Sequence, residues 1–181
     1  MADARVAETE RLILRPGRDA DVVPLYAIGQ DAEVMRYPGP PPSLADATAV
    51  PERMAAHGAD IGYCFWAVER KSGAAFIGFR GLLPAKPLID GEVEIGWRLA
   101  CEAWGRGYAR EAAQASMDWA WRNLDAPGIV AITVPANARS WGLMERLGMG
   151  RVQHRDFDHP DLPDGGPLRY HICTGSIVQH D

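Results

Sequence analysis

The chain has little cysteine, and what it has is scattered. Three cysteines occur in 181 residues, at Cys64, Cys101 and Cys173, and no CxxC or CxxxC pair is present. Disulfide frameworks and structural zinc sites usually show an even number of cysteines or close spacing, so the sequence argues against both. We therefore expect reduced thiols, a cytoplasmic protein and no bound metal.

An excess of positive charge and long hydrophobic runs are also lacking. The 19 Lys and Arg residues are outnumbered by 24 Asp and Glu residues, giving a net charge of −5. This balance argues against binding to nucleic acid or to an anionic membrane. The N-terminal residues are charged and contain no apolar signal segment. The longest apolar runs, such as Cys64–Val68, are too short to cross a bilayer. We predict partners other than nucleic acid or membrane.

Length and composition predict one domain over residues 1–181. Hydrophobic residues make up 47% of the chain and charged residues 24%, which is close to the average for globular proteins. Residues 12–14, 63–69, 75–83, 92–99, 129–134, 152–157 and 169–174 are predicted strands. Residues 21–29, 43–57, 107–124 and 137–147 are predicted helices, with Asp19 as an alternative start of the first and Pro51 expected to disturb the second. Because strands and helices intermix without strict alternation, we expect an α+β fold with a mixed sheet.

The segment Glu102–Ala109 carries the strongest chemical signal. It places Gly105 and Gly107 between a predicted strand and a long predicted helix. Backbone amides at a helix start suit a phosphate or pyrophosphate, and nearby arginines make the segment locally basic. The alternative is an ordinary glycine-rich turn. A dinucleotide-binding motif fits poorly, because Arg110 stands where the third glycine would be.

Segments in order along the chain resemble the GNAT N-acetyltransferases, in particular the RimJ/RimL-like branch of ribosomal-protein N-terminal acetyltransferases. The matching segments are Thr9–Pro16, Glu94–Trp97 followed by Leu99, Trp104–Ala109 followed by Glu111-Ala112, and Asn137–Ser140 followed by Leu147–Met149. This ordered set is far more specific than any one motif. The resemblance implies a GNAT-like fold: a twisted, mostly antiparallel sheet of six to seven strands with helices on both faces. It also implies a splay between the fourth strand, Glu92–Leu99, and the fifth, Ile129–Val134, with acetyl-CoA in the cleft.

The resemblance also implies roles for individual residues. Backbone groups near Trp97 and Leu99 would pair with the pantetheine, amides from Gly105 to Arg110 would hold the pyrophosphate, and the start of the last predicted helix would face the pantetheine arm. The implied acetyl-CoA-binding residues are Trp97, Leu99, Trp104, Gly105, Arg106, Gly107, Tyr108, Ala109, Arg110, Asn137 and Ser140. Arg106, Arg110 and Arg139 are candidates for the 3′-phosphate. Asn137 and Ser140 could instead serve only to begin the helix.

Two residues are candidates for proton transfer. Many GNAT enzymes carry a tyrosine acid where this chain has Met144, which cannot donate a proton usefully. Ser140 is then the better candidate for the acid, with water as a fallback. Glu94 is the candidate base, because an amine nucleophile must lose a proton. Glu92, or a purely solvent-facing role for both glutamates, remains the alternative.

These features predict an acetyl-CoA-dependent N-acetyltransferase that acts on a primary amine by direct attack in a ternary complex. The acceptor could be a protein or peptide N-terminus or a small amine. The alternative is a catalytically weak acyl-CoA-binding module, and a homodimer is left open. The segments Tyr37–Ser43 and Asp158–Leu168 are expected to flank the acceptor side. The second is acidic and would attract a cationic amine.

Overall fold

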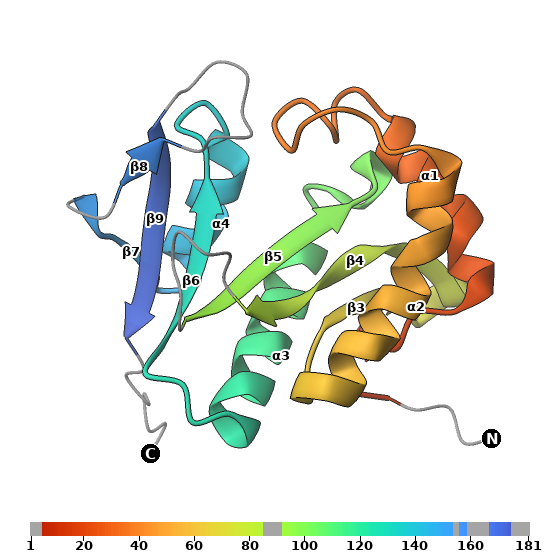
Figure 1. Cartoon of the computed structure of the whole chain (residues 1–181), viewed down its shortest axis with the longest axis horizontal. Coiled ribbons are helices and arrows are strands. Elements are labelled where there is room, and N and C mark those ends of the chain that lie inside the picture. The colour runs from red at the N-terminus through yellow and green to blue at the C-terminus, as the bar shows by residue number, and fades with distance from the viewer. Residues whose placement is uncertain (1–4, 85–91, 154–155, 159–166, 175–181) are drawn as a thin grey trace.

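The chain folds around one large mixed sheet, seen in Figure 1. The computed structural model describes residues 5–84, 92–153, 156–158 and 167–174. The strands are β1 (Ala7–Glu8), β2 (Leu12–Arg15), β3 (Phe65–Arg70), β4 (Ala75–Pro84), β5 (Val93–Leu99), β6 (Gly128–Thr133), β7 (Gly150–Arg151), β8 (Phe157–Asp158) and β9 (Pro167–Thr174). The helices are α1 (Val22–Gln30), α2 (Leu44–Ile61), α3 (Tyr108–Asn123) and α4 (Ala138–Arg146), with short 3₁₀ turns at Asp19–Asp21, Ser72–Ala74 and Cys101–Ala103. The predicted fold class is confirmed.

The sheet has the order β1-β2-β3-β4-β5-β6-β9-β7, and β8 pairs with β9. Neighbouring strands are antiparallel except β5 and β6, which are parallel. Helix α3 passes behind β4 and β5 in Figure 1, whereas α1 and α2 lie in front of the β3–β4 side. The helices therefore cover both faces of the sheet, as expected.

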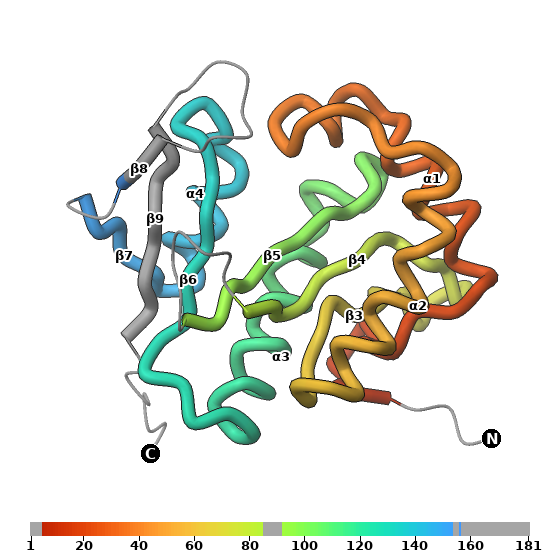
Figure 2. The backbone as a smooth tube through the Cα atoms, in the orientation of Figure 1, coloured from red at the N-terminus to blue at the C-terminus, as the bar shows by residue number. Residues whose placement is uncertain are grey.

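The sheet splays between β5 and β6. Their parallel pairing holds only at Val93 with Ile129 and at Glu94 with Val130. Beyond this point β5 runs away from β6, as the tube in Figure 2 shows. These are the fourth and fifth of the six strands that have four or more residues. The predicted splay is thus confirmed at the predicted strands.

Helix α2 runs without a break, which corrects the expectation for Pro51. Ser43 caps the helix, because its side chain accepts from the Asp46 amide and the Asp46 carboxylate accepts from the Ser43 amide. Ala47, Pro51 and Met54 form the buried stripe of the helix. Proline lacks the amide that would bond to Ala47. We attribute the continuity to the capping box and to this burial, which offset the lost hydrogen bond.

Helices α3 and α4 begin and end within one or two residues of the prediction. Gly107 precedes α3 with φ of 81°, a left-handed conformation that glycine adopts without strain. The Asn137 side chain caps α4 by accepting from the Ser140 amide at 3.3 Å. Gly148 follows α4 with φ of 79°, as its predicted position after the helix required.

The strand predicted over residues 152–157 is wrong. Two short strands, β7 and β8, lie at the ends of this stretch instead, and Val152, Gln153 and Asp156 lie in neither. The Asp156 amide donates to the Gln153 carbonyl at 3.1 Å, and Asp156 pairs with the Arg151 side chain. These local bonds form where the sequence predicted one continuous strand. Most of the predicted excursion 158–168 lies outside the described residues.

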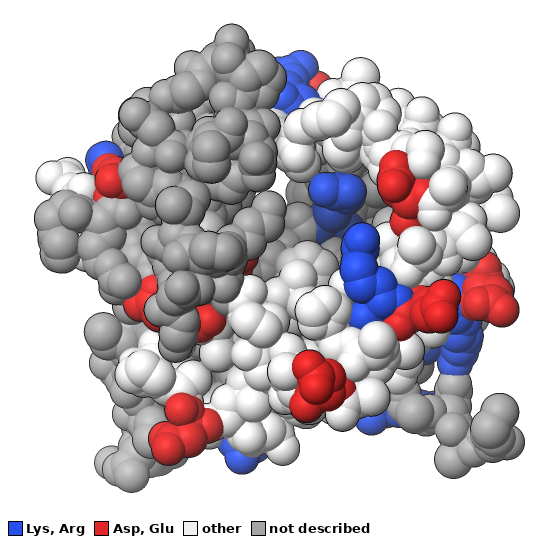
Figure 3. Space-filling model, in the orientation of Figure 1, with Lys and Arg blue, Asp and Glu red and all other residues white. Residues whose placement is uncertain are grey.

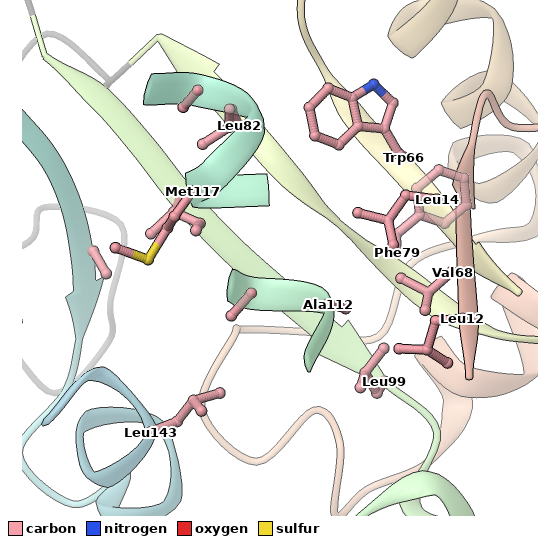
Figure 4. Packing of buried hydrophobic residues seen from close by; sticks show 14 of the residues in the cluster. Leu12, Leu14, Trp66, Val68, Phe79, Leu82, Leu99, Ala112, Met117 and Leu143 are labelled. Carbon is pink, nitrogen blue, oxygen red and sulfur yellow. The ribbon is translucent and has the colours of Figure 1, made fainter. Parts of the chain in front are cut away.

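The main core lies between the sheet and α3. Figure 4 shows Met117 of α3 close to Leu82 of β4, and Ala112 of α3 close to Leu99 of β5. All four are at most 4% exposed. Burying a side chain of the size of leucine or methionine contributes about 1.5–3 kcal/mol. This core fixes β4 and β5, and through them the strand edge at which the splay opens.

Candidate active site

A cavity of about 550 Å³ occupies the splay. Its walls come from α2, from the β4–β5 part of the sheet, and from β6 with the start of α4. The lining residues are Leu25, Tyr37, Pro38, Val50, Arg53, Met54, His57, Phe65, Phe79, Leu83, Glu94, Ile95, Gly96, Trp97, Arg98, Ile132, Thr133, Val134, Asn137, Ser140 and Met144. The structure thus brings together Glu94, Trp97, Asn137 and Ser140, four of the residues predicted for the site.

The edge of β5 that faces the splay can accept an extended ligand. The Ala100 amide, directly after β5, donates to the Ile77 carbonyl at 3.0 Å, so the backbone groups of Ala100 point toward β4. Because backbone groups alternate along a strand, those of Trp97 and Leu99 face away from β4, toward the splay. Within the described ranges, β4 is the strand that pairs with β5 beyond Glu94. An extended amide chain could therefore add to this edge as a further strand.

The two faces of β5 differ as the alternating pattern predicted. Ile95 and Leu99 are buried in the core that includes α3. Glu94, Gly96 and Arg98 occupy the other face, where all three line the cavity. The half-buried Glu94 side chain is therefore accessible to a ligand in the cavity, whereas Glu92 is not among the lining residues.

The start of α4 supplies the polar part of the opposite wall. The cap formed by Asn137 fixes the first turn of α4, so the helix-starting role considered for this residue is present. Ser140 is half-buried and lines the cavity from the same turn. Met144 follows one turn later at 1% exposure. The wall therefore carries a hydroxyl at position 140 and a thioether where many GNAT enzymes place a phenol.

The glycine loop lies outside this cavity. Gly105 and Gly107 have φ of 70° and 81°, and the whole stretch Gly105–Gly107 is exposed. The Arg11 guanidinium holds the loop by donating to the Arg106 carbonyl at 2.9 Å and to the Glu111 carboxylate at 2.6 Å. Of the residues predicted to bind the cofactor, Leu99, Trp104, Gly105, Arg106, Gly107, Tyr108, Ala109 and Arg110 do not line the cavity.

The loop is nevertheless connected to the edge of β5. The Trp104 indole donates to the Leu99 carbonyl at 2.9 Å. Gly107 and Arg110 instead line a separate groove of about 990 Å³ along α3 and β1. A ligand that reached from the cavity to the loop would have to extend along β5 toward the start of α3.

The three candidate arginines for the 3′-phosphate differ in their contacts. Arg106 donates to the Glu102 carbonyl at 3.0 Å. Arg139 forms an ion pair with Glu33 at 3.0 Å and lies 4.7 Å from the centre of the Trp104 ring. Arg110 is exposed and makes no ion pair with a described residue. Arg110 is therefore the candidate that is most available to a ligand.

The sequence prediction missed the contribution of α2 to the cavity. Val50, Arg53, Met54 and His57 line it from one stripe of this helix. Their spacing is that of one helical face, so the pattern was present in the sequence. It was obscured because Pro51 made the helix itself uncertain. Tyr37 and Pro38, from the segment expected to flank the acceptor side, also line the cavity.

Arg98 is a half-buried cation that lines the cavity, and this burial lowers the pKa of its guanidinium.

The Cys101 thiol does not line the cavity. Burial and a hydrogen bond to Asp31 raise the pKa of this thiol to about 11. Cys101 is therefore a poor nucleophile at neutral pH, since the thiolate is the reactive form. The described ranges contain no cluster of three metal-ligating side chains and no helix able to span a membrane.

Comparison with known proteins identifies the family. Residues 11–150 match the Acetyltransferase (GNAT) domain. The chain belongs to the GNAT acetyltransferase family. It is 30% identical over 145 residues to the uncharacterized protein YkkB of Bacillus subtilis, covering 78% of this chain and 83% of that protein. It is 28% identical over 145 residues to the uncharacterized N-acetyltransferase YoaA of the same organism, covering 79% and 81% of the two chains.

Solved structures of GNAT enzymes share the fold. An acetyltransferase of this family from Bacillus anthracis has a TM-score of 0.79 at 23% identity, covering 93% of this chain and 97% of that one. Spermidine N-acetyltransferase from Vibrio cholerae, solved with CoA and spermine, has a TM-score of 0.72 at 19% identity over 91% and 96%. The microcin C7 self-immunity acetyltransferase MccE, solved with acetyl-CoA and AMP, has a TM-score of 0.77 at 11% identity over 97% and 98%.

Proposed function

We propose that this GNAT protein is an N-acetyltransferase of the RimJ/RimL-like branch that moves an acetyl group from acetyl-CoA to a primary amine. The observation that carries the proposal is the open edge of β5. It meets one cavity that contains both Glu94 and Ser140. The two structural neighbours solved with CoA or acetyl-CoA support this co-substrate.

The β5 edge and the glycine loop would position acetyl-CoA. Backbone groups of Trp97 and Leu99 would hold the pantetheine, and the exposed loop from Gly105 to Arg110 would hold the pyrophosphate at the start of α3. Acetyl-CoA supplies the thioester whose C–S bond breaks. The amide of Leu99 would polarise the thioester carbonyl, since it faces the splay.

Glu94 and Ser140 would manage the protons. An ammonium group has no lone pair and cannot attack, so Glu94 would accept its proton through a water molecule. The neutral amine then attacks the thioester carbon, an N–C bond forms, the C–S bond breaks and the nitrogen gives up its extra proton. Ser140 would relay that proton to the departing sulfur, or bind the thiolate through its hydroxyl. Direct attack requires no covalent acetyl-protein intermediate, which agrees with the poor nucleophilicity expected for Cys101.

Glu94→Gln tests the proposal directly. We expect kcat/KM for an amine found by screening for CoA release to fall about 10²–10⁴-fold near neutral pH. The loss should shrink at high pH, where more of the amine is already neutral. Ser140→Ala should lower kcat more than it raises KM for acetyl-CoA, because its contribution grows as charge develops on sulfur. Glu92→Gln is measured in parallel, because a loss of this size there would assign the proton transfer to Glu92 instead.

Two results would contradict the proposal. Parallel pH profiles for the parent and Glu94→Gln, offset by less than about threefold, would assign Glu94 to the solvent-facing alternative. Acetyl-CoA binding without CoA release from any amine would favour the catalytically weak binding module, for which Met144 in the usual acid position is the structural argument.

A further inference from the structure

The ionisable residues of the cavity do not match a purely cationic acceptor. Arg53, His57 and Arg98 line it, and Glu94 is the carboxylate among its described lining residues. Figure 3 shows blue side chains beside the hollow near the centre of this face, with red side chains close to them. Among these described residues a polyamine would meet more positive than negative charge.

Arg98 lines the cavity from β5, and no carboxylate of a described residue pairs with it. Its guanidinium makes no ion pair or hydrogen bond with a described residue, and burial is the cause of its lowered pKa. A half-buried guanidinium without an anion is costly, and a carboxylate bound in two-pronged geometry would remove that cost. Arg98 lies four positions from Glu94 on the same face of the strand, which places their Cα atoms about 13 Å apart.

Arg53 provides a second cation from the facing helix. It is exposed, lines the cavity from α2, and forms no ion pair with a described residue. Its positive charge contributes to the lowered pKa of Asp46, nearly two turns earlier in α2, but Asp46 is engaged with Ser43. Arg98 and Arg53 thus line the same cavity from β5 and from α2, and each guanidinium can bind a carboxylate in a fixed fork geometry.

We propose that the acceptor is a small amine that also carries a carboxylate, bound by Arg98 and Arg53 while its amine points to Glu94. The assignment rests on the proposed function and names its substrate class. A free amino acid and a short peptide with a free C-terminus share this chemistry. The apolar lining from Tyr37, Phe65 and Leu83 would receive the rest of such an acceptor.

The experiment compares acids with their own carboxamides, which lack the negative charge, and with a polyamine. Initial rates of CoA release are measured with amino acids and dipeptides, with the same compounds as carboxamides, and with spermidine. We expect kcat/KM to be at least about tenfold higher for each acid than for its amide, which is the size of one charged hydrogen bond. The more active of the two acids identifies the source of the carboxylate.

Variants then locate the carboxylate. Arg98→Gln and Arg53→Gln should each raise KM for the acid at least about tenfold and leave KM for its amide within about twofold. Arg36→Gln is the control, because Arg36 is exposed and lies outside the cavity lining. Arg53 is itself exposed on a helix, so its variant should fold even if Arg98→Gln does not.

Three outcomes separate the possibilities. Equal rates with acids and amides, or a preference for spermidine, would overturn this inference while a response to Glu94→Gln left the proposed function intact. A rise in KM for acetyl-CoA in the Arg98 variant would assign that arginine to the cofactor and also overturn it. Absence of CoA release from every amine would contradict the proposed function instead.

Discussion

Two buried arginines in the β2–β5 part of the sheet have opposite surroundings, one near the outer edge and one near the splay. Arg15 on β2 is 4% exposed and donates to both carboxylate oxygens of Asp21, at 2.7 and 2.8 Å, and to Glu69 at 2.7 Å. Arg80 on β4 is fully buried, and its one hydrogen bond within the described residues goes to the Ser116 hydroxyl at 3.0 Å. Its Nε and Nη2 atoms have no partner there.

The surroundings of Arg80 explain how the fold accommodates it. Trp66 and Trp97 are its register partners on the neighbouring strands, and the Trp97 ring lies 5.9 Å from the guanidinium. Attraction to an aromatic ring offsets only part of the desolvation cost of a buried cation. The outer edge of the sheet thus neutralises its buried charge with its own carboxylates. The strands beside the splay hold Arg80 and Arg98 without a carboxylate partner among the described residues, and of these two arginines Arg98 lines the cavity.

Removing a partner at the outer edge should have the largest effect on stability. Asp21→Ala leaves Arg15 buried with Glu69 alone and removes the acceptor of the Arg18 amide. Breaking a buried ion pair from one side costs about 3–5 kcal/mol. We expect a loss of that size in the free energy of unfolding, measured by chemical denaturation.

Asp19→Ala is the matched control, because Asp19 is exposed in the same turn. It should change the free energy of unfolding by no more than about 0.5 kcal/mol. Similar losses in the two variants would mean that the turn, rather than the ion pair, determines the stability of this edge.

The central arginine should behave in the opposite way. Arg80→Met removes an unpaired buried charge and keeps most of the side-chain volume, and Ser116 retains its hydrogen bond to the Ala112 carbonyl. Replacing buried ions with apolar residues is often neutral or stabilising by about 1–4 kcal/mol. We expect a gain in the free energy of unfolding within that range.

A loss of more than about 1 kcal/mol in Arg80→Met would show that the guanidinium has a stabilising partner in the folded protein. The contrast between the two arginines would then disappear. Arg80→Lys distinguishes charge from shape, because it keeps the charge and should give no gain.

Much of this contrast could not be predicted from the sequence. The alternating pattern from Glu92 to Leu99 correctly identified β5 and its two faces, since local periodicity reports which side chains are buried. Nothing local reveals that Arg15 has partners at Asp21 and Glu69, because the second lies 54 positions away on a neighbouring strand. The buried Arg80 was missed for the same reason. Its burial depends on α3, which packs across β4 from a distant part of the chain.

The candidate site shows the same limits. Glu94, Asn137 and Ser140 were found through family motifs that lie on regular elements, and the structure gathers them in one cavity. Arg53 and His57 carry no motif, and they reach the cavity only because α2 lies over the sheet. The glycine loop was predicted from its amides, but its separation from the cavity depends on the position of α3.

The pH dependence of stability sharpens the comparison further. Burial lowers the pKa of Arg80 from its usual, much higher value to about 9. Between these two values the unfolded chain binds one proton more than the folded chain, so this group makes stability rise with pH. Below about pH 9 both states carry the proton, and the full cost of the buried charge is present. The advantage of Arg80→Met over the parent should therefore be constant below pH 9 and shrink above it, by up to about 1.4 kcal/mol per pH unit.

Denaturation of both proteins from pH 7 to 10.5 measures this difference. Taking the difference between variant and parent cancels other groups that titrate in this window. A constant difference up to pH 10.5 would show that Arg80 keeps its proton in the folded state and is better solvated than its burial indicates.

An exposed pair across the splay should give the smallest effect. Arg139 of α4 pairs with Glu33, which follows α1, and their side chains are 71% and 38% exposed. Exposed ion pairs contribute about 0.2–1 kcal/mol, because water already solvates both charges. A double-mutant cycle with Arg139→Gln and Glu33→Gln should give a coupling free energy in this range, and 0.5 M salt should reduce it by screening. Arg139 also contacts the Trp104 ring. Glu33→Gln does not change this contact, so the double-mutant cycle cancels its contribution and the coupling free energy reports the ion pair.

A coupling free energy above about 2 kcal/mol that did not fall with added salt would mean that the ion pair is desolvated and holds the two sides of the splay together. In that case the centre of the molecule, like its outer edge, would neutralise its own charges, and the difference between the two regions would be confined to Arg80 and Arg98.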